Sequence, residues 1–195
     1  MIKNQMEMFS IRFFKIFIFH AFILHASLVN CQWFLQNPLP QGNSLNTVSF
    51  EYLNFGFTGG DCGTILKTVN SGANWTITTT ETLQNIKDIQ MITSLIGYAV
   101  GGDYDPEIPE LLPSAILKTT DGGENWSPLF SDTLGQFFSV FFTHPDTGYV
   151  AGNQGCILKT TNGGQTWISL PTGTTKLILS IWFINSNHGF AAGER

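Results

Sequence analysis

Apolar residues recur at fixed positions ahead of four glycine–aromatic pairs: Gly56-Phe57, Gly97-Tyr98, Gly148-Tyr149 and Gly189-Phe190. Counting back from each glycine, an apolar residue stands eleven, eight and six positions upstream. The eleventh position holds Leu45, Ile86, Phe137 and Ile178; the eighth holds Val48, Ile89, Val140 and Ile181; the sixth holds Phe50, Met91, Phe142 and Phe183. Residues two apart lie on the same face of a β-strand. The pattern therefore predicts a strand with one apolar face in every copy.

A second motif follows each of the first three pairs. It reads Ile-Leu-Lys at 65–67, 116–118 and 157–159, and continues as Thr-x-Asn/Asp-x-Gly-x-x-Trp at 68–75, 119–126 and 160–167. Each tryptophan precedes the next glycine–aromatic pair by 22 residues, and the underlying period is 41 residues, within the ~40–50 residues of a β-propeller blade. In the first copy, strands are expected at 47–51, 56–59, 64–68 and 75–78. The lysines, Lys67, Lys118 and Lys159, are expected to extend from strand ends into solvent near the blade rims.

The fold class that follows is all-β: a β-propeller built of four-stranded antiparallel blades. We expect the propeller to occupy residues 32–195, with blades at about 45–78, 86–129, 137–170 and 178–195. The last copy holds only two strands, and Trp33 stands 23 residues before Gly56, which predicts an orphan outer strand at 33–36. The expected assembly is an incomplete ring of about three and a half blades. We expect such a fragment to be truncated or to close only with another chain, and to oligomerise or aggregate by itself.

Nine positions of the Thr-x-Asn/Asp turns are predicted to be structural. They are Asn70, Gly72, Trp75, Asp121, Gly123, Trp126, Asn162, Gly164 and Trp167. The Asn/Asp oxygen can accept hydrogen bonds from the turn's amides, glycine reaches positive φ without penalty, and tryptophan buries the turn against the sheet. Asp121 corresponds to two asparagines, which cannot perform carboxylate acid–base chemistry, so no catalytic residue is expected here. The three tryptophans are expected to be equivalent.

These turns resemble the Asp-box, or bacterial neuraminidase (BNR), repeat of β-propellers. With Gly-Tyr, ILKT, TTDGG and Trp together, residues 33–193 are most similar to the photosystem II assembly and stability factor family and its secreted bacterial relatives. This resemblance implies a non-catalytic binding or scaffold module, photosystem II assembly factor-like in its repeat type, with an unknown protein or glycan as partner. Asp-box propellers also include sialidases and other glycosidases, so a carbohydrate-active hydrolase is the alternative.

The first 31 residues have the layout of a secretory signal peptide. Arg12 and Lys15 precede an apolar stretch of 14 residues at 16–29, which matches a signal h-region and is shorter than the ~20 residues of a membrane-spanning helix. Cleavage before Gln32 predicts a secreted or cell-envelope protein, periplasmic or extracellular, with no stable membrane span. Acylation of Cys31 in a lipoprotein is the alternative.

Composition narrows the function further. The net charge of −5, with only nine lysines and arginines, argues against a nucleic-acid partner. Beyond residue 31 the chain has one arginine, Arg195, so the arginine cluster with which a sialidase holds its substrate is missing. We therefore expect a chain that is not an enzyme. Cys62, Cys156, His144 and His188 lack the spacing of a metal site, so no metal, no cofactor and two unpaired thiols are expected.

Copy two departs from the others by a ten-residue insertion between its second and third strands. The candidate binding loop within this insertion comprises Asp103, Tyr104, Asp105, Glu107 and Glu110. Its carboxylates suit a cation such as Ca²⁺ or a partner contact, whereas the alternative is a solvated loop stiffened by proline. A glycosidase needs two carboxylates about 5–9 Å apart, and the sequence does not pair the loop's acids with Asp61 or Asp88.

Overall fold

The computed structural model describes residues 42–103, 114–132 and 136–195, all within the compact unit Asn37–Arg195. Several predictions fall outside these ranges: the signal peptide at 1–31, the outer strand at 33–36, and the loop residues Tyr104, Asp105, Glu107 and Glu110. Among the described residues, no helix has the length and apolar character needed to cross a membrane.

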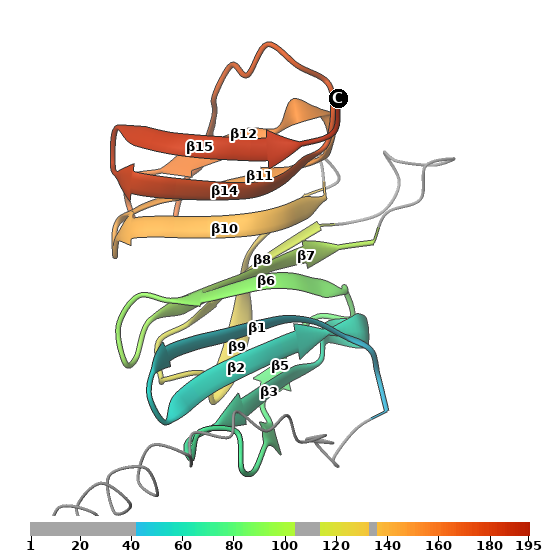
Figure 1. Ribbon diagram of the computed structural model, residues 1–195, viewed down its shortest axis with the longest axis vertical. Helices are drawn as coiled ribbons and strands as arrows, with labels where there is room; N and C mark the ends of the chain where they lie inside the picture. Colours follow the sequence, from blue (N-terminus) through green and yellow to red (C-terminus); the bar gives the residue numbers. More distant parts are fainter. Residues whose placement is uncertain (1–41, 104–113, 133–135) are drawn as a thin grey trace, which may run out of the picture. The chain divides into compact units, whose positions relative to one another are not determined.

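The described strands form successive antiparallel sheets, which we number as blades 1 to 4 (Figure 1). Blade 1 contains β1 (Leu45–Tyr52), β2 (Phe55–Gly60), β3 (Ile65–Thr68) and β4 (Thr76–Ile77). Blade 2 contains β6 (Ile86–Met91), β7 (Gly97–Gly102), β8 (Ser114–Thr119) and β9 (Asn125–Asp132). Blade 3 contains β10 (Phe137–His144), β11 (Thr147–Gly152), β12 (Ile157–Thr160) and β13 (Ile168–Ser169). Blade 4 contains β14 (Ile178–Asn185) and β15 (His188–Gly193).

Each blade is a meander in which neighbouring strands follow one another along the chain. The pairing of the first two strands has the same register in every blade: Val48↔Thr58, Ile89↔Ala99, Val140↔Val150 and Ile181↔Ala191. An irregularity also recurs near the start of each first strand, two residues ahead of that pair. The repeated sequence columns therefore correspond to repeated positions in space.

One strand was not expected from the pattern. The short strand β5 (Thr79–Thr80) lies in the connection from blade 1 to blade 2. It pairs in parallel with β9, at Thr79↔Asn125 and Thr80↔Trp126. Because this segment has no alternation of apolar residues, its pairing depends on the backbone and on the course of the connection.

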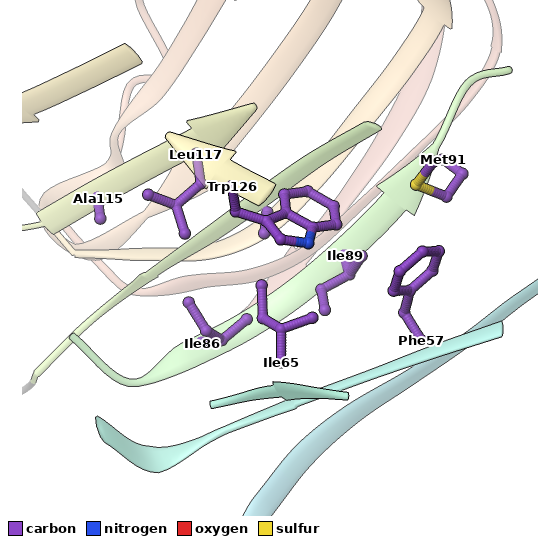
Figure 2. Packing of buried hydrophobic residues seen from close by; sticks show 9 residues of the cluster. Phe57, Ile65, Ile86, Ile89, Met91, Ala115, Leu117 and Trp126 are labelled. Atoms are coloured by element: carbon purple, nitrogen blue, oxygen red, sulfur yellow. The ribbon is translucent and has the colours of Figure 1, made fainter. Parts of the chain in front are cut away.

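The core consists of clusters between successive blades. Phe57 and Ile65 of blade 1 face Ile86, Ile89 and Trp126 of blade 2 in the first cluster (Figure 2). The second cluster joins Tyr98, Val100 and Ile116 of blade 2 to Phe137, Val140, Phe142 and Val150 of blade 3. The third joins Tyr149 and Ala151 of blade 3 to Ile178 and Ile181 of blade 4. In blades 2 to 4, the predicted apolar face of the first strand therefore packs on the preceding blade, whereas the same face of β1 in blade 1 is exposed.

Candidate binding surface

Residues 68–75, 119–126 and 160–167 link the third and fourth strands of blades 1 to 3, and we call them the repeat turns. In each, a threonine hydroxyl accepts a hydrogen bond from the glycine amide at 2.9 Å: Gly72 to Thr68, Gly123 to Thr119, and Gly164 to Thr160. The Oδ1 of Asn70, Asp121 and Asn162 accepts the amide four residues on, at 2.8, 3.1 and 2.9 Å. The three glycines have φ of +84°, +81° and +86°, a region in which a Cβ is costly.

Asp121 makes the same contacts as its asparagine counterparts. Its Oδ2 also accepts a hydrogen bond from Asn125 Nδ2 at 2.8 Å. The Asn125 side chain, the Asn125 amide and the Thr119 hydroxyl lower the pKa of Asp121 to about 2. A carboxylate held ionised by its own turn is poorly matched to proton transfer at neutral pH, so the contacts of Asp121 are those of a structural residue.

The three tryptophans of the repeat turns are not equivalent in burial. Trp126 is fully buried and meets the edge of Phe57 in blade 1, with ring centroids 5.7 Å apart. Trp75 and Trp167 are only half-buried. The ring of Trp75 meets the ring of Phe50 in its own blade edge to face, with the ring centroids 6.1 Å apart. Phe50 is itself exposed. Trp167 is half-buried although it packs on the cluster between blades 2 and 3, so a preceding blade alone does not bury a repeat-turn tryptophan, and full burial is a property of the joint between blades 1 and 2.

The lysines of the third strands connect blades. Lys67 Nζ lies 2.6 Å from Glu124 Oε1, and Lys118 Nζ donates to the carbonyl of Gly163 at 3.0 Å, both in the repeat turn of the next blade. Lys118 also lies over the ring of Tyr98, 5.2 Å from its centroid. The prediction that these side chains extend into solvent is wrong for Lys67, which is only 8% exposed, because the neighbouring blade covers it.

Polar side chains also link the first strands of successive blades. Asp88 Oδ2 in β6 accepts the amide of Val140 in β10 at 2.9 Å and the hydroxyl of Ser139 at 3.2 Å. Ser139 Oγ in turn accepts the amide of Ile181 in β14 at 3.3 Å. Burial raises the pKa of Asp88, and the hydrogen bonds from Val140, Ser139 and Ile89 oppose that rise. Asp88 is thus tied into the joint between blades 2 and 3.

The remaining acidic candidates are distributed over the chain. Asp61 Oδ1 accepts a hydrogen bond from Asn46 Nδ2 at 3.0 Å. Asp103 begins the candidate binding loop, and its carbonyl accepts a hydrogen bond from the Gln136 side chain. In the described ranges, no group of three or more His, Cys, Asp or Glu side chains is placed to hold a metal ion.

Two of the three cysteines, Cys62 and Cys156, lie in the described residues, at the connections between second and third strands. Cys62 is exposed in the 3-10 turn Asp61–Gly63, and Cys156 is half-buried just after the 3-10 turn Asn153–Gly155. Neither forms a disulfide in the described part of the chain. Burial raises the pKa of the Cys156 thiol, which lowers its thiolate fraction and its reactivity.

An open groove lies where the hairpin ends of blades 3 and 4 meet, and we call it the hairpin groove. It encloses about 630 Å³. Its lining includes Phe141, Phe183, Thr143, His144, Asn185 and Ser186. One wall is fixed by Tyr149, which stacks on Phe183 at 3.9 Å and donates its hydroxyl hydrogen to the Ser186 carbonyl at 2.7 Å. The groove combines aromatic surface with hydroxyl, imidazole and amide groups, as ligand sites usually do.

The stacked antiparallel blades define a β-propeller fold, and comparison with solved structures confirms this prediction. No family model matches the sequence, and no curated protein matches it. The structure resembles YCF48 bound to D1 peptide, with a TM-score of 0.60 and 22% identity over 73% of this chain and 44% of that chain. It also resembles YCF48 from Cyanidioschyzon merolae, with a TM-score of 0.59 and 20% identity over 81% of this chain and 59% of that chain.

A second group of similar structures consists of enzymes. The GH74 xyloglucanase from Xanthomonas campestris has a TM-score of 0.60 and 13% identity over 76% of this chain and 27% of that chain. The chain thus spans about half the length of the YCF48 structures and about a quarter of the xyloglucanase. At these identities the comparisons establish the fold, and both binding proteins and glycosidases share it.

Sequence reasoning missed the hairpin groove and the polar links between blades. A signal for the groove was present seven positions ahead of the third glycine–aromatic pair, where the groove residue Phe141 replaces the Ser49 and Gln90 of the first two copies. For the polar links, Lys67 and Lys118 repeat in sequence, but a repeat does not reveal that the partner lies in the next blade.

Proposed function

We propose that this chain is an exported, non-catalytic binding module that holds an extended segment of a partner protein in the hairpin groove. Export rests on the arrangement of Arg12, Lys15 and the apolar stretch that follows them. A peptide ligand is supported by the likeness in fold to YCF48, one structure of which contains a D1 peptide.

The observation that carries the proposal is how the polar side chains are used. In a hydrolase, Asp88 and Asp121 would be candidate catalytic acids. Here, Asp88 accepts a hydrogen bond that links blades 2 and 3, and Asp121 accepts one within its own repeat turn. Lys67 and Lys118 likewise bind neighbouring repeat turns. In contrast, the hairpin groove offers aromatic surface and exposed polar groups at the blade ends. Such a surface can bind a ligand without transferring a proton.

Glycoside hydrolysis is the second candidate, because GH74 enzymes share the fold. Xyloglucan is the substrate to test, since one of these structures is a xyloglucanase. The carboxylates of Asp88 and Asp121 accept hydrogen bonds that hold a joint and a turn together, which favours binding over hydrolysis. A measurement of reducing ends released from xyloglucan decides between the two.

The binding test uses the full chain and a phage-displayed library of random dodecapeptides. We expect selected peptides to bind the unmodified chain and to lose at least about tenfold in affinity with Ser186→Trp, which fills the groove. Asn187→Trp is the matched control, because Asn187 is the exposed neighbour in the same hairpin. Equal losses in both variants, no selected peptide, or release of reducing ends from xyloglucan would each overturn the proposal.

A further inference from the structure

Blades 1 and 4 each expose an apolar face in the described structure. The front face, on β1, consists of Leu45, Val48 and Phe50, which are 40%, 65% and 47% exposed. The back face, on β14 and β15, includes Trp182 and Phe190, which are 56% and 68% exposed. Isolated exposed apolar residues are common, but grouped ones mark interaction surfaces.

The clusters between successive blades show which kind of surface each exposed face can pack against. At each joint between blades, residues equivalent to the front face pack on residues equivalent to the back face. Front-type residues are Ile86, Ile89 and Met91 in blade 2, Phe137, Val140 and Phe142 in blade 3, and Ile178 and Ile181 in blade 4. Back-type residues are Phe57 in blade 1, Tyr98 in blade 2 and Tyr149 in blade 3. The chain therefore carries both halves of one recurring interface.

The polar contacts of the interior joints have counterparts on the two faces. Ser139 Oγ accepts the amide of Ile181 across the joint between blades 3 and 4. The residues at the equivalent positions are Ser180 on the back face and Val48 on the front face. Similarly, the rings of Trp126 and Phe57 meet edge to face across the joint between blades 1 and 2. The equivalent of Trp126 in blade 1 is the half-buried Trp75, and the equivalent of Phe57 in blade 4 is the exposed Phe190.

We propose that the front face of one copy of this chain packs on the back face of a second copy, head to tail. Contacts between successive blades involve mainly their first two strands. Blade 4 has both of these strands, so it can present most of the interface. Because the two faces differ, the contact is heterologous, and it builds a closed ring or a longer chain according to the rotation between copies. A second copy is thus the partner of each face, because it carries the complementary half of the joint that recurs between successive blades.

The test measures mass by sedimentation of the purified full chain between about 1 and 100 μM, which brackets typical weak association. The N-terminal residue is determined by mass spectrometry. We expect a mass that rises with concentration to a dimer or more. Val48→Lys on the front face and Phe190→Lys on the back face should each weaken association at least about tenfold, because a charge is placed in the interface. Both residues are exposed in one copy, so folding should be retained, and circular dichroism checks this.

Mixing the two variants tests the head-to-tail arrangement. Each variant keeps one intact face, so an equimolar mixture should recover dimers while each variant alone remains monomeric. The two introduced lysines repel each other, which prevents the damaged faces from pairing. Leu83→Lys is the control, since Leu83 is 81% exposed in the connection between β5 and β6 and belongs to neither β1, β14 nor β15, and it should leave association unchanged. A monomeric unmodified chain, no recovery on mixing, or an equal effect of Leu83→Lys would refute the inference.

Discussion

Replacing Trp126 with alanine should destabilise the protein far more than the same change at Trp75. Trp126 is fully buried between blades 1 and 2 and contacts Phe57 edge to face. Truncation of such a residue removes about 3–5 kcal/mol from the free energy of unfolding, since a cavity remains. Trp75 is half-buried against an exposed Phe50. Because Trp75 keeps part of its surface in solvent, its truncation removes less buried area and should cost less, about 2–3 kcal/mol.

The measurement is urea unfolding followed by far-ultraviolet circular dichroism, because tryptophan fluorescence would change with the substitution itself. The comparison is made at a concentration low enough to keep the chain monomeric, so that no second copy covers Trp75. The denaturation midpoint should fall much further for Trp126→Ala, with the slope unchanged. Equal losses for the two variants would show that the preceding blade does not determine the contribution of these tryptophans.

Two further substitutions probe a turn and a joint between blades. Gly123→Ala should cost about 1–2 kcal/mol for its positive φ and about 1–3 kcal/mol more because a Cβ would run into the buried Phe57 ring. Gly173→Ala has a similar φ but open space around it, so thermal melting should separate the two variants, and equal shifts would contradict the argument. Asp88 has a raised pKa, so its protonated form favours folding and its contribution is lost as pH rises above the ordinary value of about 3.8 through the folded value. Urea titrations over that range should show this fall in the unmodified chain and not in Asp88→Asn; parallel curves would exclude Asp88 as its source.

The strands of this protein were predictable because the repeat displays them several times. Val48, Ile89, Val140 and Ile181 each stand eight residues before a glycine, and all four occupy the same register position. The repeat turns were predictable for a related reason, since threonine, Asn/Asp and glycine bond within a few residues of one another. Short-range hydrogen bonding is a property that a short motif can specify.

Contacts between blades were harder to predict than contacts within them. Asp88 appears in the sequence as a lone acid among strand residues, and only the arrangement of β6 beside β10 brings it to the amide of Val140. Equivalent turns also differ in burial, since Trp126 is fully buried between blades 1 and 2, whereas Trp75 and Trp167 are half-buried. Such differences depend on neighbours that lie far away along the chain, which the local pattern does not encode.

The hydrogen bonds between blades give the array a direction. Asp88 and Ser139 accept amides from the following blade, and Lys118 donates to the following repeat turn. Blades 2 and 3 therefore each accept an amide of the following blade through a side chain at the same position of the first strand. A duplication of one 41-residue unit would insert a blade whose two sides already match its neighbours. Recombination between repeats can thus lengthen or shorten such a gene in whole-blade steps without inventing a new interface.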